Sequence, residues 1–212
     1  EPDNVAARVR LVAALRETGA RDQAIQVLTE GVRRAQDDPA ALSSLVNAAA
    51  DDIEEVVADL DLGPGGDRES RDTRLRLAQA LVGTGNVDPA LTMLRSMEPG
   101  QGDEELFRRQ FLAVANLRGG DAEAALEEAE ALVADYPENA GAHNLLGGIH
   151  LAAERFDAAR QAFEQARELN PDGAQPRFNL GLVAAASGDL EQAATHFERG
   201  LERDPDNIGA VL

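Results

Sequence analysis

The sequence contains no cysteine, no tryptophan and no lysine. Without cysteine there is no disulfide, no cysteine-ligated zinc and no thiol catalysis. Aromatic residues make up only 3% of the chain, so its core must consist mainly of Ala, Leu and Val. These small side chains allow helices to approach one another closely. No run of 18 apolar residues occurs, so no membrane-spanning helix is predicted.

Alternating runs of Val, Ile and Thr, the pattern typical of strands, are also missing. The predicted class is therefore all-α. Charge is strongly of one sign, with 39 acidic residues against 20 basic ones and a net charge of −19. Such a surface repels phosphate backbones and anionic lipid, so we expect neither a nucleic-acid partner nor direct insertion into a membrane.

What the sequence does contain is a repeat. Several residue types recur with a period of 34, which chance does not explain and which indicates a repeat architecture. The recurring positions are Pro137, Pro171 and Pro205; Ala125, Ala159 and Ala193; Leu146 and Leu180; Gly147 and Gly181; and Phe163 and Phe197.

Each copy predicts two antiparallel helices. On the first helix Gly147 is small, so that the second helix can approach, and Phe163 fills the wedge beside it. Pro171 ends the second helix because proline has no N–H group to donate. Asp121 and Asp189 are predicted N-caps, and Asp88-Pro89 is interpreted as an N-cap followed by the first helical residue.

The copies tile almost the whole chain. They are 5–38, 71–104, 106–139, 140–173 and 174–207, with a shortened copy at 39–70. In that copy, two short helices (about 40–50 and 53–60) lead into a Gly/Pro loop at 61–70, and 208–212 resembles the start of a further first helix. We predict one continuous right-handed superhelical solenoid of antiparallel helix pairs, made of two regions, 1–70 and 71–212. Neither end has a polar capping helix, so we expect a fragment of a longer array.

A period of 34 with Leu-Gly early, Ala near the middle, Phe four residues later and Pro near the end resembles the tetratricopeptide repeat. This sequence departs from the family at His143 and Arg177, where the family prefers Trp, and at His150 and Ala184, where it prefers Tyr. The resemblance implies an α-α superhelix that binds other proteins and does no catalysis.

The segment 138–170, with its runs HNLLGGIHL and ARQAFEQA, is similar to a narrower group. It resembles the periplasmic tetratricopeptide lipoproteins that accompany PEP-CTERM protein sorting and exopolysaccharide export. That likeness implies a periplasmic scaffold, anchored to the outer membrane through a lipidated cysteine upstream. A cytosolic adaptor or co-chaperone-like regulatory module remains the alternative. A polysaccharide-contacting module is disfavoured because stacking aromatic residues are scarce.

Candidate chemical sites have simpler interpretations. His143 and His150 lie seven residues apart, roughly 10 Å along a helix, at positions where the family places packing aromatics, so packing is favoured over a metal. The carboxylates at 51–55 and 127–130 are interpreted as solvated helix starts and outer faces. The string 59–63 lacks the ligands of a calcium loop, and the glycines at 63–66 and 83–85 follow no strand and precede no lysine. We expect no enzyme activity, cofactor or metal.

The resemblance implies that the first helix of each copy lines a concave groove for a protein or peptide partner. The family's groove positions correspond here to Phe107, Gln110, Arg118, Asn144, Leu151, Gln175 and Phe178. The Lys and Asn pairing that clamps a C-terminal carboxylate is missing. The mixture of apolar and amide side chains suits an extended peptide or a partner helix, although packing against the neighbouring repeat is an open alternative for Phe107 and Phe178.

Overall fold

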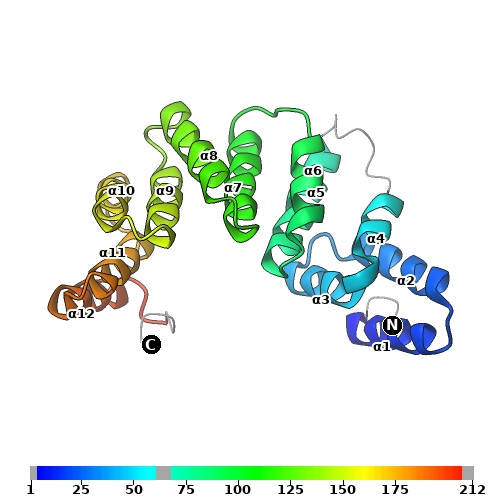
Figure 1. Cartoon of the computed structure of the whole chain (residues 1–212). Helices are drawn as coiled ribbons and strands as arrows, with labels where there is room; N and C mark the ends of the chain where they lie inside the picture. The colour runs from blue at the N-terminus through cyan, green and yellow to red at the C-terminus, as the bar shows by residue number, and fades with distance from the viewer. Residues whose placement is uncertain (1–3, 61–67, 207–212) are drawn as a thin grey trace. The chain divides into compact units, whose positions relative to one another are not determined.

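The computed structural model describes residues 4–60 and 68–206, and within them every regular element is a helix (Figure 1). The elements are α1 (Val5–Glu17), α2 (Arg21–Arg34), α3 (Pro39–Ala49), the 3-10 segment η1 (Ala50–Asp52), α4 (Ile53–Asp59), α5 (Arg68–Gly83), α6 (Val87–Ser96), α7 (Asp103–Arg118), α8 (Ala122–Asp135), α9 (Ala140–Ala152), α10 (Phe156–Leu169), α11 (Gln175–Ala186) and α12 (Leu190–Leu201). The predicted all-α class is confirmed. The loop glycines at 63–66 and the helix start at 208–212 lie outside the described residues.

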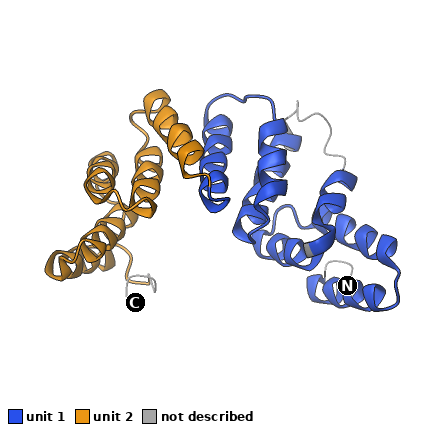
Figure 2. Ribbon diagram, viewed as in Figure 1, with its two compact units in different colours: residues 1–120 blue, residues 121–212 orange. Residues whose placement is uncertain are grey.

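The chain divides into two compact units, Glu1–Gly120 and Asp121–Leu212 (Figure 2). The boundary falls between α7 and α8, inside the copy predicted at 106–139. The two regions predicted at 1–70 and 71–212 remain a prediction.

In the first unit, α1 packs along α2 and α5 packs along α6. The shortened copy is arranged differently. In it η1 connects α3 to α4, and α4 packs mainly against α2 and less against α3. The core of this unit is aliphatic, as the composition predicts, with Leu28, Leu45, Leu77 and Leu81 at most 2% exposed. Burial of such side chains is the main stabilising contribution to the unit.

In the second unit, α9 pairs with α10 and α11 pairs with α12. Phe163 is fully buried, and a Cβ atom added at Gly147 would lie 2.6 Å from two atoms of its ring. The next repeat does the same, since a Cβ at Gly181 would lie 2.5 Å from the Phe197 ring. The predicted pairing of a small residue with an aromatic wedge is therefore confirmed.

The helix starts test the capping predictions. Asp121 accepts a hydrogen bond from the Ala124 N–H, and Asp189 accepts one from the Gln192 N–H, both at 3.0 Å, so these two N-caps are confirmed. The Asp88 prediction is wrong, because α6 begins at Val87 after Asn86. Proline is tolerated throughout the first turn, where N–H groups have no partner within the helix, so a proline alone does not locate the cap.

Two adjacent glycines of α9 should respond oppositely to alanine. Gly147→Ala should lower the free energy of unfolding of the second unit by about 1–3 kcal/mol, because the new methyl group overlaps the Phe163 ring. A Cβ atom at Gly148 meets nothing within 4 Å, so Gly148→Ala should raise that free energy by up to about 1 kcal/mol through helix propensity. Urea denaturation of both variants checks the pair, and equal effects would contradict it.

Candidate functional site

The first helices of the second unit, α9 and α11, contain no Asp or Glu, although the chain as a whole is strongly acidic. Their one arginine, Arg177, is turned back along the chain and donates hydrogen bonds to the carbonyl oxygens of Gly173 and Pro171, each at 2.5 Å. The two helices lie side by side. Together they form a surface whose chemistry is set by neutral side chains.

A row of side-chain amides joins these two helices. Asn179 donates from Nδ2 to Asn144 Oδ1 at 2.7 Å, and Gln175 donates from Nε2 to Asn179 Oδ1 at 3.1 Å. Asn144 Nδ2 and Gln175 Oε1, at the ends of the row, make no hydrogen bond with any other residue in 4–60 or 68–206. The row therefore offers a donor at one end and an acceptor at the other, the two groups that a peptide backbone requires.

Sequence reasoning placed Asn144 and Gln175 on this surface but missed Asn179, the residue that connects them. The available signal was local, because Gln175 and Asn179 are four residues apart and such amide pairs meet on one helix face. The link to Asn144 comes from the neighbouring repeat, 35 residues away.

Aliphatic groups continue the same surface. Gly148 lies one turn from Asn144 with open space above it, and Leu182 lies one turn from Asn179 with 47% of its side chain exposed. Leu151 is half-buried against the core of the second unit. We call the set Asn144, Gly148, Gln175, Asn179 and Leu182 the amide face.

Phe178, another predicted groove residue, is not part of the amide face. Its side chain is only 5% exposed, and its ring contacts Gly200 on α12 so closely that a Cβ atom there would overlap it. The ring belongs to the core between α11 and α12. The sequence left open packing against the neighbouring repeat for this residue, whereas the ring packs against the second helix of its own repeat.

The groove residues predicted on α7 belong to the first unit and differ among themselves. Phe107 is 48% exposed and Gln110 is half-buried. Arg118 donates to the Val82 carbonyl oxygen at 2.6 Å, which ties the end of α7 to the last turn of α5. A guanidinium group at a helix C-terminus satisfies a carbonyl that has no partner within its helix, so Arg118 has a structural role.

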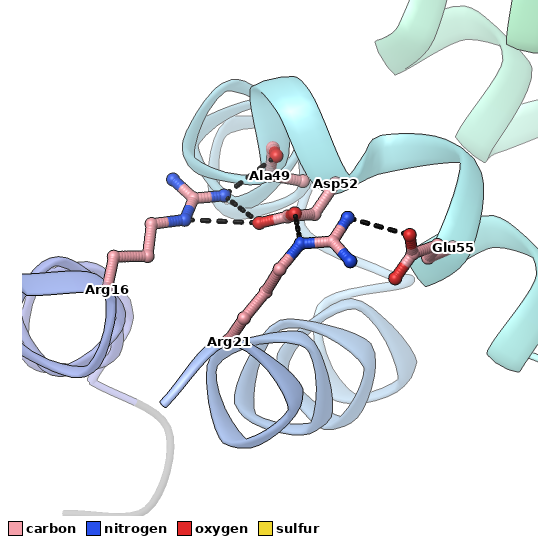
Figure 3. A network of polar contacts seen from close by, with 5 residues as sticks. All are labelled: Arg16, Arg21, Ala49, Asp52 and Glu55. Atoms are coloured by element: carbon pink, nitrogen blue, oxygen red, sulfur yellow. Dashed lines mark hydrogen bonds and ion pairs between the residues drawn. The ribbon is translucent and has the colours of Figure 1, made fainter. Parts of the chain in front are cut away.

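One of the carboxylates interpreted as solvated is in fact buried. Asp52 is 4% exposed and accepts hydrogen bonds from Arg16 at 2.6 and 3.1 Å and from Arg21 at 2.8 Å (Figure 3). Arg16 also donates to the Ala49 carbonyl oxygen at 2.9 Å, and Arg21 to Glu55 at 2.6 Å. The network connects α1 and α2 to η1 and α4 through residues that lie 31 to 36 positions apart in sequence.

Two opposing effects act on this carboxyl. Burial raises the pKa of Asp52, but the hydrogen bonds from Arg16 and Arg21 outweigh burial, so that its pKa lies below the usual value. A general acid or base needs a pKa near the operating pH. Asp52 therefore stabilises the fold and is not a candidate for catalysis.

Family models described as tetratricopeptide repeat match residues 112–174 and 149–208, and a second such model matches residues 1–49. Together these matches cover more than half of the chain. The chain belongs to the tetratricopeptide repeat family.

Solved structures support this fold. TTC0263, a thermophilic tetratricopeptide repeat protein of Thermus thermophilus, matches with a TM-score of 0.62 and 19% identity over 97% of this chain and 94% of that one. MamA (residue 41 to the end) of Desulfovibrio magneticus RS-1 matches with a TM-score of 0.57 and 19% identity, covering 85% and 97%. The predicted α-α superhelical fold class is confirmed by these neighbours and by the helical structure.

Curated relatives are much longer than this chain. Cellulose synthase operon protein C of Komagataeibacter sucrofermentans is 35% identical over 69 residues, which is 32% of this chain and 5% of that protein. Superkiller complex protein 3 of Mus musculus is 29% identical over 157 residues, 70% of this chain and 10% of that protein. No helix in the described part of the chain is long and apolar enough to cross a membrane.

The departures from the tetratricopeptide pattern have a structural explanation. His143 and Arg177 stand where the family prefers Trp, and both contact the carbonyl oxygen of the proline six residues earlier. His143 Nε2 donates to Pro137 at 2.8 Å, and Arg177 donates to Pro171 at 2.5 Å. In both tetratricopeptide repeats this hydrogen bond fixes the turn that precedes the first helix.

His150 is half-buried on α9, and burial is the largest effect that lowers its pKa. Arg155 lowers the pKa further, while Glu130 opposes the shift. The lowered pKa favours the neutral ring, which suits a side chain that packs within a tetratricopeptide repeat. No group of three or more potential metal ligands occurs among the described residues.

Proposed function

We propose that this protein is a scaffold that binds an extended polypeptide segment on the amide face of its tetratricopeptide repeats. Tetratricopeptide repeats imply a protein-interaction scaffold, and repeats of this kind are typically non-catalytic. The observation that carries the proposal is the row Gln175–Asn179–Asn144, whose ends keep a donor and an acceptor for a partner's main chain. Leu182 supplies apolar contact beside the row. Strand-like recognition of this type combines main-chain hydrogen bonds with side-chain contacts.

We further propose that the scaffold acts in a bacterial system for exopolysaccharide export and PEP-CTERM protein sorting, as a periplasmic protein anchored to the outer membrane. Two observations support this proposal. The segment 138–170 resembles periplasmic lipoproteins of such systems, and a stretch of 69 residues is 35% identical to a cellulose synthase operon protein. Because the chain spans about a twentieth of that protein's length, the role of the whole protein is part of the proposal.

The second candidate is a cytosolic adaptor. The likeness to Superkiller complex protein 3, which by its name is part of a complex, supports the adaptor role and extends over 70% of this chain. Cell fractionation separates the two candidates. Recovery of the full-length protein with the outer membrane supports the export scaffold, and recovery in the cytosol contradicts it and supports the adaptor.

Photo-cross-linking tests the amide face itself. With p-benzoylphenylalanine in place of Leu182 in the full-length protein, irradiated cells should yield a cross-linked polypeptide. Adding Asn179→Ala should lower that yield about tenfold, because it removes the centre of the amide row, and leaving a buried hydrogen-bonding group without its partner costs about 1–3 kcal/mol.

Gln165→Ala is the matched control, since Gln165 is an exposed amide on the second helix α10. It should leave the cross-linking yield unchanged. Equal yields from Asn179→Ala and the parent protein would exclude the amide face as the binding surface. Mass spectrometry of the product then shows whether the captured polypeptide belongs to a polysaccharide-export system.

A further inference from the structure

A small pocket lies between α3 and α5 in the first unit, apart from the amide face. Its volume is about 230 Å³. The residues that line it are Gln36, Pro39, Leu42, Ser43, Arg76, Gln79, Ala80 and Gly83. Both helices are the first helices of their copies. On each helix the lining residues are separated by three or four positions, so they lie on one face of that helix.

The pocket has a mixed lining, in which apolar residues stand beside polar ones. Leu42 and Ala80 are 2% and 6% exposed and provide apolar contact. Gly83 is the last residue of α5, and a Cβ atom there would meet nothing within 4 Å. Packing inside this chain therefore does not require glycine at position 83, and a larger side chain would occupy the pocket without displacing the backbone.

Ion pairs and hydrogen bonds within the chain fix the polar residues at the rim of the pocket, Arg76 and Gln36. Arg76 forms ion pairs with Asp37 at 2.5 Å and with Asp72 at 2.9 Å, and it donates to the Gln36 carbonyl oxygen at 3.2 Å. The side-chain oxygen of Gln36 accepts a hydrogen bond from the Thr73 hydroxyl at 3.2 Å. A rim fixed in this way lowers the entropy cost of binding.

The size of the pocket limits what it can hold. Sites for drug-sized ligands and cofactors measure roughly 300–1,000 Å³, and this pocket is smaller. One large amino-acid side chain fits the available space. Charge further limits which side chain the pocket can bind. Arg76 is the one charged lining residue, and it is already paired with two carboxylates. A charged side chain would be buried there without a counter-ion, which is costly.

We propose that this pocket binds a single uncharged aliphatic or aromatic side chain of a polypeptide partner, as an anchor for that partner. The proposal rests on the proposed function in one respect, namely that the partner is a polypeptide. The exposed Gln79 amide and the Nε2 group of Gln36 lie beside the pocket and are suited to hydrogen bonding with the main chain next to the anchor. Binding hot spots are typically side chains that fill a well-packed pocket, with surrounding contacts that exclude water.

Amide NMR of the full chain with small probes tests this pocket directly. N-acetyl-leucinamide and N-acetyl-phenylalaninamide, at millimolar concentration, should shift the backbone signals of Ser43 and Gly83 and the side-chain signals of Gln36 and Gln79. N-acetyl-glycinamide and N-acetyl-lysinamide should not shift them. Equal shifts from the lysine probe, or no shift from the leucine probe, would overturn the proposal.

Gly83→Leu should fill the pocket and weaken binding of the leucine probe at least tenfold, with the thermal midpoint unchanged or raised. Gln165→Leu is the matched control, because it adds the same side chain at an exposed helical position of the second unit, outside the amide face. It should leave probe binding unchanged. Undiminished binding in Gly83→Leu would show that the probe sits elsewhere.

The two proposals fail in different ways. If Gly83→Leu abolishes probe binding while the Asn179→Ala variant cross-links normally, the pocket proposal is supported and the amide-face proposal is contradicted. If the leucine probe shifts no signal at the pocket while Asn179→Ala lowers the cross-linking yield, the amide-face proposal is supported and the pocket proposal is contradicted.

Discussion

Phe163→Ala should lower the free energy of unfolding of the second unit by about 3–5 kcal/mol, the range for removal of a buried aromatic ring. The Phe163 ring is fully buried, and it contacts the α9 backbone at Gly147, where no side chain stands between the two helices. Alanine would leave a cavity that the flanking helices cannot close without moving. Hydrogen exchange resolved by peptide measures the effect separately for each unit, with faster exchange expected in α9 and α10.

Leu190→Ala provides the control, since Leu190 is 72% exposed on α12 and its loss should change stability by less than about 0.5 kcal/mol. A double-mutant cycle tests the contact itself. In the Phe163→Ala background the methyl group of Gly147→Ala has room, so the combined loss should be clearly smaller than the two single losses added together. Additive losses would show that the ring and the glycine do not interact.

Asp52→Asn should lower the free energy of unfolding of the first unit by about 2 kcal/mol. Removing one partner of a fully buried ion pair costs about 3–5 kcal/mol, but the side chains of Arg16 and Arg21 are 33% and 53% exposed, so water replaces part of the lost interaction. Hydrogen exchange in α1, α2 and α4 should accelerate. Asp51→Asn is the matched control, because Asp51 is the exposed neighbour and should have little effect.

The contribution of Asp52 should also depend on pH. Because the folded-state pKa of Asp52 lies below its ordinary value of about 3.9, folding favours the ionised form. Its stabilising contribution is therefore complete above the unfolded-state pKa and is lost as the pH falls through the lower, folded-state pKa. The stability difference between the parent and Asp52→Asn should be constant from about pH 5 to 7 and shrink below about pH 4. A difference that persists unchanged at lower pH would contradict the role of the ionised carboxylate.

The sequence by itself determined the helical class of the fold and the way the two helices meet in the repeats at 140–173 and 174–207. Three prolines spaced by 34 residues, at 137, 171 and 205, mark the ends of second helices. The repeated combination of a glycine with a phenylalanine specifies how two helices of one repeat meet. These signals are local: a cap, a helix end or a contact within one hairpin depends on residues close in sequence. That is why Asp121, Asp189, Gly147 and Phe163 were placed correctly from the sequence.

Only the tertiary structure decided which side chains face a neighbouring helix and which face solvent. Asp52 resembles any acid at a helix start until α1 and α2 bring two arginines to it from more than 30 residues away. Phe178 occupies a groove position of its repeat, yet Gly200 on α12 leaves room for its ring in the core. Asn179 gains its role through Asn144 of the preceding repeat. In each case the outcome depends on the rotation of a helix about its own axis and on the partner it meets, and a few tens of degrees of rotation separate a buried side chain from an exposed one.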